Sequence, residues 1–479
     1  MSGQTDYIGE LFKEKNEKKD DRKPPYVVVS PDGLEAYIKI PDNPLPADVT
    51  ELLSKKDVVS GVDMELAATI TKNLYDRLKL ESSYLVAKGK KPVHGQPGEL
   101  ILRTKKPEDI ILSSEDLTQV DYKVYKRKLL AIAEQEKPVA MIIDPTNGHD
   151  GLDVHGNTLK GENGADVEIV MGKNVYQSGR KLISKIDGLI EYKKDPDGKI
   201  HFDITEVYMV DGDVDYTTGN VDFPGSVIVR GIIKAGFEVR AKNEVVADTI
   251  RGNVFAGGSV VAKQGIIGGV QKAYIECGGS VHAKFIQGAK IIADDSVEVK
   301  KSIIMAEIYA EGFVLVDNAP GSIIGGSINA VNGVDARVLG SESFVRTEIL
   351  LCRSAKSIIK IKQVIAKRFE VSKHLLRIET YLGKEKDKLF SEASGDRQDL
   401  ANKLLAKREE LRRELLEKNA ELKELQEDLR TPVEGQINVG RTVWPEVRVS
   451  VAGKFLLLKN ETGKVTYFYN AETDSLDFR

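Results

Sequence analysis

Between residues 219 and 337 the chain repeats one short alternation of apolar and polar positions seven times. Each copy is a pair of six-residue blocks, in which the third residue is Val or Ile and the fifth is usually small. The first copy reads GNVDFP-GSVIVR, and the fourth reads AYIECG-GSVHAK. Successive copies start 18, 15, 21, 16, 17 and 20 residues apart. A fixed pair of blocks with a spacer of variable length is typical of a solenoid, in which each coil adds the same unit.

The third and fifth positions of a block share one face, because side chains two residues apart in a strand point the same way. β-branched residues suit an inward pleated face, and the Ala-rich fifth column predicts a narrow interior with no room for a ligand. Gly, Asn, Asp and Ser gather at block starts, where the chain turns a corner. We therefore expect a three-sided β-solenoid (a single-stranded β-helix) with two regular faces and one irregular side. Its third positions are Val221, Val227, Val239, Val245, Val254, Val260, Ile275, Val281, Ile291, Val297, Ile308, Val314, Ile328 and Val334.

Residues 353–430 follow a different pattern, with apolar residues at alternating spacings of three and four. This stretch has no Pro and only two Gly, of which Gly395 marks the expected break and Gly383 falls inside a helical pattern. The pattern predicts two helices of more than thirty residues, each roughly 50 Å long, that pair as an antiparallel coiled-coil hairpin. The apolar positions before the break are Ile358, Ile361, Ile365, Leu375, Leu382 and Leu389, and those after it are Leu404, Leu411, Leu415, Leu422, Leu425 and Leu429.

The hairpin interrupts the solenoid rather than ending it. Residues 347–351 enter it as a strand, and residues 435–440 again form a block of the solenoid type. Residues 454–459 and 464–470 are expected to form a final hairpin around 460–463. A closing turn with Trp444 and Phe455 would cover the open end of the stack, as repeat proteins require.

The first part of the chain predicts a mixed α and β fold. We expect a hairpin around Pro31-Asp32-Gly33, helices over 48–54 and 63–80, and strands over 84–87 and 100–103. Residues 117–134 are expected to be helical in part, and turns are expected at Asn163-Gly164 and Asp197-Gly198. The predicted organisation is a flexible charged arm (1–25), an α+β domain (26–215), the β-solenoid (216–352), the coiled-coil hairpin (353–430), and returning solenoid strands with a C-terminal β cap (431–479).

Composition narrows the class of protein. The 479 residues are 41% hydrophobic and 30% charged, and the net charge of −4 gives no reason to expect a nucleic-acid partner. No apolar run approaches the roughly 20 residues of a membrane span, and the charged N-terminus lacks a signal-peptide core. Only two cysteines occur; Cys277 falls in the Ala column and is expected to be a core thiol. We expect a cytoplasmic protein.

Three short segments resemble parts of metal-binding or phosphate-binding motifs, but the spacing of their residues does not fit those motifs. Asp211, Asp213 and Asp215 resemble the start of a calcium loop, but Tyr216 stands where that loop needs Gly. Asp195 and Asp197 flank a Pro and precede a Gly, which indicates a turn. The pair Gly172-Lys173 lacks the flanking residues of a phosphate loop.

Three histidines are candidates for functional groups. His282 points outward from its block, and an outward His at a subunit interface serves some β-solenoid acyltransferases; a solvated surface His is the other interpretation. His94 and His155 each lie in a Val-His-Gly turn, and no Cys or carboxylate spacing around them suggests a ligand set. We therefore assign no catalytic, cofactor or metal site from the sequence.

An outward apolar stripe on the solenoid is a more promising surface. The fourth positions of the first three second blocks are Ile228, Val246 and Val261. An exposed stripe of this kind usually has a partner. Either the domain of residues 26–215 packs there, or the stripe binds another protein or a second copy. The hairpin is the other expected docking element, and because its heptads can be satisfied internally, homo-oligomerisation stays open.

The run VDGDVDYTTGNVDFPGSVIVRG, the repeated blocks, the segment IIGGSINA followed by VLGS, and Trp444-Pro445 after a helical hairpin together resemble the flagellar assembly protein A family. The chain departs from the family at Glu446, where members usually carry Gly, and at Leu351-Cys352, where they usually carry Val-Gly. The resemblance implies a bacterial cytoplasmic protein, with a solenoid akin to those of bactofilins and septum-site proteins. It further implies a role near flagellar assembly or polar organisation, no established catalytic activity, and no functional residue to carry over.

These observations favour a non-enzymatic scaffold that binds protein partners. The alternative is a β-solenoid enzyme, either a hexapeptide-type acyltransferase or a polysaccharide-active enzyme. Such an enzyme needs a His at an interface or a groove lined with carboxylates, and the outward columns carry no carboxylate cluster that persists over adjacent coils.

Overall fold

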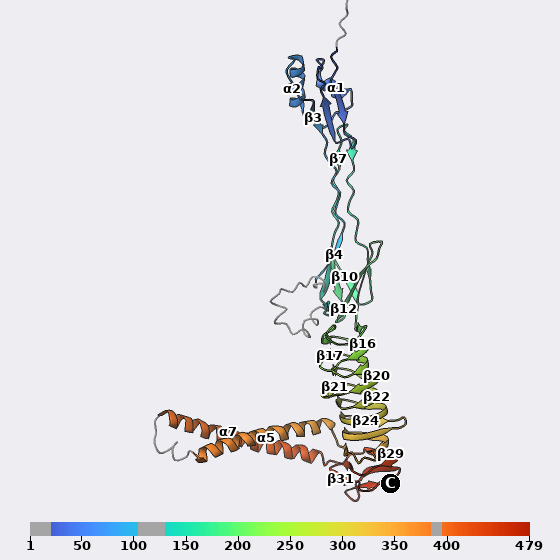
Figure 1. Ribbon diagram of the computed structural model, residues 1–479, viewed down its shortest axis with the longest axis vertical. Helices are drawn as coiled ribbons and strands as arrows, with labels where there is room; N and C mark the ends of the chain where they lie inside the picture. Colours follow the sequence, from blue (N-terminus) through green and yellow to red (C-terminus); the bar gives the residue numbers. More distant parts are fainter. Residues whose placement is uncertain (1–20, 104–129, 385–394) are drawn as a thin grey trace, which may run out of the picture.

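A computed structural model describes residues 21–103, 130–384 and 395–479. The molecule is elongated: two small lobes and a β-solenoid follow one another along its long axis, and a pair of long helices projects sideways near the C-terminal end (Figure 1). The expected fold class, an α+β region followed by a solenoid with an inserted helical hairpin, is confirmed. The charged arm predicted for residues 1–25 lies almost entirely outside the described residues.

The first lobe is a three-stranded antiparallel sheet covered by two short helices, as the sequence predicts. The side chains of Asp48 and Asp63 accept hydrogen bonds from the backbone N–H groups of Thr50 and Leu66, which fixes the start of each helix. The second helix ends at Tyr75, earlier than expected. The elements are β1 (Tyr26–Val29), β2 (Glu35–Lys39), α1 (Val49–Ser54), α2 (Met64–Tyr75) and β3 (Ser83–Lys88).

The second lobe has a hydrophobic core of its own, so the single domain expected over 26–215 contains two cores. Leu182, Phe202 and Ile204 are fully buried between its two four-stranded sheets. Of the partly helical stretch expected at 117–134, residues 117–129 lie outside the described residues and Ile132–Ala133 is a strand. One sheet has the order β10 (Val175–Ser178), β11 (Lys181–Ser184), β6 (Pro138–Ile143), β4 (Glu99–Leu102), and the other β5 (Ile132–Ala133), β12 (Gly188–Lys194), β13 (Ile200–Thr205), β9 (Ile169–Met171).

Three extended chains, which the sequence pattern does not predict, join the two lobes (Figure 1). They run through residues 89–98, 144–151 and 157–167, and include the short pair β7 (Gly151–Leu152) and β8 (Thr158–Leu159). The backbone N–H of Gly95 donates to the carbonyl of Glu162, and that of Gly164 to the carbonyl of Thr146. Asn163-Gly164 is therefore part of this connector rather than a turn.

Glycines three residues apart let the connector chains approach closely. A Cβ at Gly95 would lie 1.9 Å from the carbonyl oxygen of Thr146, and one at Gly164 would lie 1.9 Å from that of Gln96. Only Gly fits where three backbones meet this tightly, as at the axis of other glycine-packed chains. The pairs are Gly95 and Gly98, Gly148 and Gly151, and Gly161 and Gly164.

The solenoid is built from parallel ladders in which each predicted column stacks in register. Val221 pairs with Val239, and the same column continues beyond the predicted copies to Ile349 and Val449. The stack begins at Val207, earlier than the boundary expected at residue 216. The first-face strands are β15 (Val221–Phe223), β17 (Glu238–Ala241), β19 (Asn253–Ala256), β21 (Ala273–Cys277), β23 (Ala289–Ala293), the end of β24 (Val297–Ala310), the end of β26 (Ser322–Ala330), β28 (Thr347–Leu351) and β30 (Val447–Val451).

The second and third faces are formed mostly by single strands that bend at the corner between them. The irregular third side predicted from the spacers carries its own inward column, from Ile233 and Ile250 to Leu339 and Val443, with register shifts at the bend. The start of β24 belongs to the second face and the start of β26 to the third. The other strands are β14 (Val207–Val210), β16 (Ser226–Ile233), β18 (Val245–Ile250), β20 (Val260–Ile267), β22 (Val281–Gln287), β25 (Phe313–Val316), β27 (Gly333–Leu339) and β29 (Gln436–Val443).

The interior is closed, as the columns predict. Val245 and Val297 are fully buried, and Ala247 plugs the space beside the first of them. Each buried β-branched side chain contributes about 1.5–3 kcal/mol relative to an exposed one. No coil is independent, because every inward side chain packs on those of the coils above and below.

The C-terminal cap differs from the one expected. Strand β31 (Lys454–Leu457) pairs with β30, and β32 (Val465–Asn470) pairs with β29 and β33 (Ser475–Phe478), so the expected hairpin of 454–459 with 464–470 does not form. Phe455 is exposed and Trp444 only half-buried; Leu458, Val465 and Tyr467 close the stack instead. Glu446, at the position where the family usually has Gly, adopts a φ of 63°, a left-handed conformation that favours Gly.

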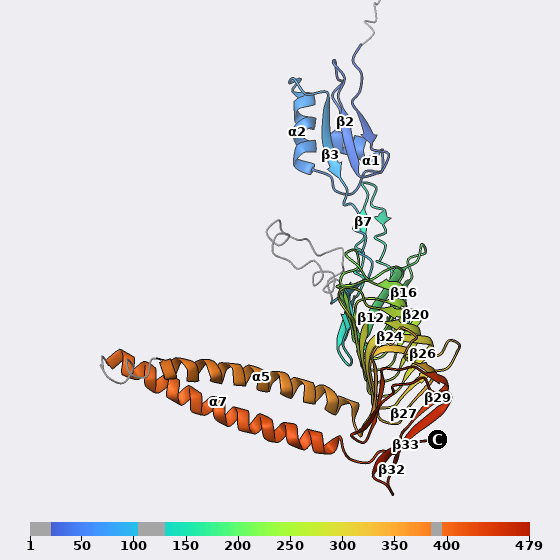
Figure 2. The same ribbon diagram turned by 60° about the horizontal axis from the view of Figure 1, so that its bottom comes forward.

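The helical hairpin is inserted between β28 of the first face and β29 of the second. Helices α5 (Ala355–Lys384) and α7 (Gly395–Asp428) pack along their lengths (Figure 2). Gly383 lies within α5 as predicted, whereas Gly395, where the break was expected, is the first residue of α7. The α7 seam is as predicted, but on α5 the seam uses Val364 and Val371, and Ile365 is exposed; Leu389 lies outside the described residues.

We expect Gly164→Ala to separate the connector chains, because the added Cβ would clash with the carbonyl oxygen of Gln96. Cleavage of the connector by a non-specific protease should then be about tenfold faster or more, since opening costs less free energy. Gly269→Ala is the matched control, because a Cβ at Gly269 meets nothing within 4 Å. Equal protease resistance of Gly164→Ala and the wild type would show that the connector is not glycine-packed.

Candidate functional site

His282, the residue on which an acyltransferase interpretation would depend, lies on the second face. Its Nδ1 is 3.2 Å from the Oε2 atom of Glu298, one coil further on, and both side chains are about half exposed. The two residues are ladder partners on neighbouring coils. This geometry gives His282 a partner within the solenoid wall, on an exposed face.

The calcium-like aspartates are neutralised by basic side chains of the next coil. The Lys234 ammonium lies 3.1 Å from Asp213 and 2.8 Å from Asp215, and Arg230 lies 3.0 Å from Asp211. A hydrogen bond from the Ile232 N–H and the contact with Lys234 hold the pKa of Asp213 below its usual range. Lys234 therefore occupies the place between two carboxylates that a cation would take. Within the part of the chain that the structure describes, no three His, Cys, Asp or Glu residues are grouped to hold a metal ion.

The remaining polar candidates take part in local contacts. His155 Nδ1 lies 3.0 Å from the carbonyl oxygen of Asp57, and His94 Nδ1 accepts a hydrogen bond from the Glu162 N–H. Asp195 accepts a hydrogen bond from His201 at 2.8 Å and turns the chain with Gly198 between β12 and β13. The structure thus ties each of these side chains to a different turn.

The apolar stripe of Ile228, Val246 and Val261 stacks as one ladder on the second face, as the sequence predicts. It continues N-terminally to Met209, which is exposed, and ends at His282. The three predicted residues are half-buried. The stripe is therefore a narrow apolar ridge along the first coils of the solenoid.

The hairpin is rooted on the outer side of the first face. Ile292 and Tyr309 are outward residues of successive coils, and both are buried by Ala355 and Ile358 of α5. The Lys362 ammonium donates a 2.7 Å hydrogen bond to the Tyr309 hydroxyl. Apolar burial and this polar contact together attach the first turns of α5 to the solenoid wall.

Electrostatics fix the direction in which α5 leaves the solenoid. The Glu311 carboxylate accepts hydrogen bonds from the Ser354 hydroxyl at 3.0 Å and from the Lys356 N–H at 2.8 Å. A carboxylate at a helix N-terminus satisfies unpaired N–H groups and interacts favourably with the helix dipole. The Lys356 side chain also pairs with Asp294 at 2.6 Å, which raises the pKa of this lysine. These contacts orient the first turn of α5 on the solenoid wall.

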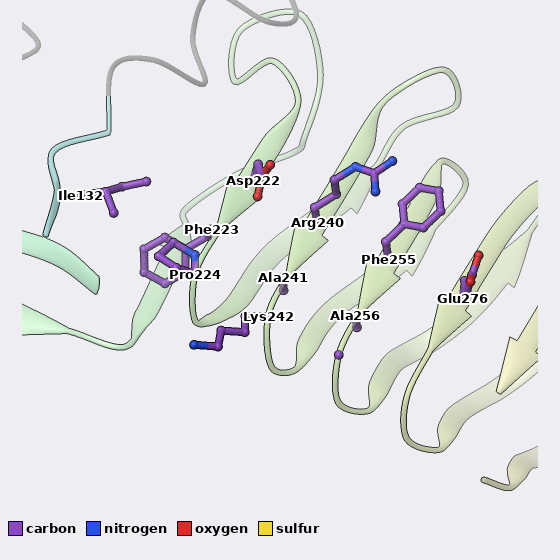
Figure 3. A pocket seen from close by; sticks show the side chains of 11 residues that line it. Ile132, Asp222, Phe223, Pro224, Arg240, Ala241, Lys242, Phe255, Ala256 and Glu276 are labelled. Carbon is purple, nitrogen blue, oxygen red and sulfur yellow. The ribbon is translucent and has the colours of Figure 1, made fainter. Parts of the chain in front are cut away.

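A hollow of about 830 Å³ lies on the same face, over the first coils of the solenoid and beside Ile132 of the second lobe (Figure 3). The Arg240 guanidinium lies 4.0 Å from the ring centroid of Phe255, and Arg240 also pairs with Glu238 at 2.6 Å. Lys242 contacts Asp187 at 3.5 Å. The lining is thus a mixed-charge surface whose basic groups have acidic partners in the chain, which suits a protein contact better than general acid–base chemistry.

Comparison with protein families shows to which family this chain belongs. Residues 206–474, more than half of the chain, match the Flagellar Assembly Protein A beta solenoid domain. The chain belongs to the flagellar assembly protein A family. Residues 25–195 match the N-terminal region of the same family, so the family extends over both lobes. Comparisons with curated proteins and with solved structures found no match.

The family assignment agrees with the resemblance seen in the sequence and links the chain to flagellar assembly. Among the described residues, no helix is both long and apolar enough to cross a lipid bilayer. The hairpin helices are long, but charged side chains cover much of their surface.

Sequence reasoning missed the hairpin root, although a signal for it exists. The blocks AKIIAD and AEIYAE place apolar Ile292 and Tyr309 at outward fourth positions of consecutive coils. Two large apolar residues at adjacent outward positions indicate that something covers them. The order of the chain then favours the segment that leaves the solenoid two coils later, which is α5.

Both thiols should resist modification in the folded protein. Burial raises the pKa of Cys277 to about 11 and that of Cys352 to about 12. The thiolate is the reactive form, so at pH 8 only about one Cys277 in a thousand is ionised. We expect no reaction with a thiol reagent at pH 8 in native protein, and two equivalents after denaturation. Rapid native labelling at pH 8 would contradict the buried positions.

Proposed function

We propose that this chain is a non-enzymatic scaffold that acts in flagellar assembly through protein–protein contacts made in the cytoplasm. Family membership supports the link to flagellar assembly. The closed interior supports a structural role, because inward Val, Ile and Ala side chains fill the solenoid. No catalytic activity is required by any side-chain arrangement described above.

The observation that carries the proposal is the rooted hairpin. The solenoid ladders continue directly from β27 to β29 and from β28 to β30, so the stack is complete without the inserted helices. The hairpin is nevertheless attached through a buried apolar cluster and a capping carboxylate. A long arm held at a fixed angle suits a docking element that presents one surface to a partner.

An acyltransferase-like enzyme is the alternative, and it would depend on His282. The pairing of His282 with Glu298 on an open face favours the structural role over the catalytic one. Replacing His282 therefore separates the two hypotheses.

A shortened hairpin tests the proposal. Residues 368–415 are replaced by a short Gly-Ser turn, which keeps the root contacts of Ile358, Ile361 and Leu422. We expect the solenoid to unfold at an unchanged temperature, because its ladders and the hairpin root are intact. In a bacterium that lacks the native gene, the full-length chain should restore flagella, and the shortened chain should not.

His282→Ala in the full-length chain is the matched control, and it should restore flagella as well as the wild type. If the shortened chain restores normal flagella at equal protein levels, the hairpin has no docking role. If His282→Ala abolishes function without changing thermal stability, the enzyme hypothesis replaces the scaffold.

A further inference from the structure

The two flanks of the hairpin differ in chemistry. On one side of the seam, Lys360 approaches Glu421 and Lys367 approaches Glu414, each at 3.9 Å. These residues occupy the same heptad position, next to the buried positions, on both helices. We call this side the charged flank. Tyr381 continues the same heptad position on α5.

The opposite side carries a row of exposed hydrophobic residues, which we call the apolar flank. Ile365 is 41%, Phe369 69% and Leu376 64% exposed, and their spacings of four and seven place them on one face of α5. Leu416 of α7 is 69% exposed.

An ion pair shows that both helices contribute to the apolar flank. Arg412 of α7 lies 2.7 Å from Glu379 of α5, and these two residues sit on the side of the seam opposite to the charged flank. Glu379 is two heptads after Ile365, and Leu416 is one helical turn after Arg412. Leu416 therefore lies on the same side as Ile365, Phe369 and Leu376, next to them across the hairpin.

In an isolated hairpin these apolar side chains would remain exposed to water and would not stabilise the fold. Such positions in isolated coiled coils usually carry Lys, Glu or Gln, as the charged flank does at Lys360, Lys367, Glu414 and Glu421. The exposed apolar residues of the charged flank, Tyr381 and Leu400, lie at its distal end. Phe369 and Leu376 contribute nothing to the seam, which Val371 and Leu375 fill. The apolar flank is thus the surface of the hairpin that binding would desolvate.

We propose that the apolar flank binds the same flank of a second copy, so that two hairpins form an antiparallel four-helix bundle. This inference rests on the proposed function, in which the hairpin is the docking element, and it names the partner. The contact is isologous: each Phe369 packs near Leu416 of the other copy, close to the two-fold axis.

Charge supports a second copy in the antiparallel orientation. Lys423 is 80% exposed at the root end of the flank and lies 3.9 Å from Glu427, and Glu409 is half-exposed toward the distal end, where it pairs with Arg408 and Arg412. An antiparallel pair places Lys423 of each copy near Glu409 of the other, whereas a parallel pair places like charges together. These two exposed charges are therefore complementary only in the antiparallel orientation.

The shape of the molecule allows this arrangement. The hairpin projects away from the solenoid along most of its length (Figure 2). In an antiparallel pair the two solenoids lie at opposite ends of the bundle, so they do not collide. A short apolar centre between charged ends predicts a reversible dimer that weakens as salt increases.

Sedimentation equilibrium of the full-length chain tests the proposal. We expect a monomer–dimer equilibrium that Phe369→Glu weakens at least about tenfold, because it buries two unpaired carboxylates. Tyr381→Glu is the matched control: it introduces the same charge at an exposed aromatic residue, but on the charged flank, and should leave the dimer unchanged. Circular dichroism should show equal helix content in all three proteins.

A charge swap tests the orientation. Lys423→Glu or Glu409→Lys alone should weaken the dimer, and the double variant should restore it, because each substituted residue again faces an opposite charge. A wild-type chain that stays monomeric, or a dimer insensitive to Phe369→Glu, overturns the proposal. If the wild-type chain is monomeric but the shortened hairpin still fails to restore flagella, the self-association inference is wrong and the proposed scaffold function is retained.

Discussion

The structure depends on one constraint: each inward side chain of the solenoid must stack on the equivalent side chain of the next coil. A parallel ladder satisfies the backbone hydrogen bonds only if the coils have the same perimeter, and β-branched residues beside Ala fix that perimeter. Val245 meets Val227 and Val260 in this way, with no space left between them. Because the interior is full, whatever this protein recognises must be recognised on its outer surface.

Some apolar residues on the outer surface of the solenoid are covered by other parts of the chain, and others are exposed. The hairpin root buries Ile292 and Tyr309, while Met209 remains exposed at the start of the second-face stripe. The glycine-packed connector holds the first lobe away from the solenoid, so that lobe does not cover the stripe (Figure 1). The stack, the hairpin and the connector thereby separate these outer surfaces from one another, as the proposed scaffold role requires.

Residue periodicity predicted those parts of the molecule in which one local rule repeats. The inward columns, the insertion of the hairpin and the α7 seam follow from spacings of two or of three and four residues. The α5 seam was misassigned at Ile365, because Val364 and Ile365 are adjacent apolar residues and spacing alone does not choose between them. Each connector chain carries two glycines three residues apart, but this spacing does not show which chains pack together. The connector and the Leu458–Tyr467 cap both depend on contacts between distant segments.

Hydrogen–deuterium exchange of backbone amides, read by peptide along residues 207–339, tests the closed three-faced stack most directly. The account predicts slow exchange on all three faces, including the third-face amides of Ile250, Ile266 and Ile303, whose ladders are continuous with the rest. Exchange of the third-face peptides within seconds, while the other two faces stay protected, would show an open stack and contradict the account.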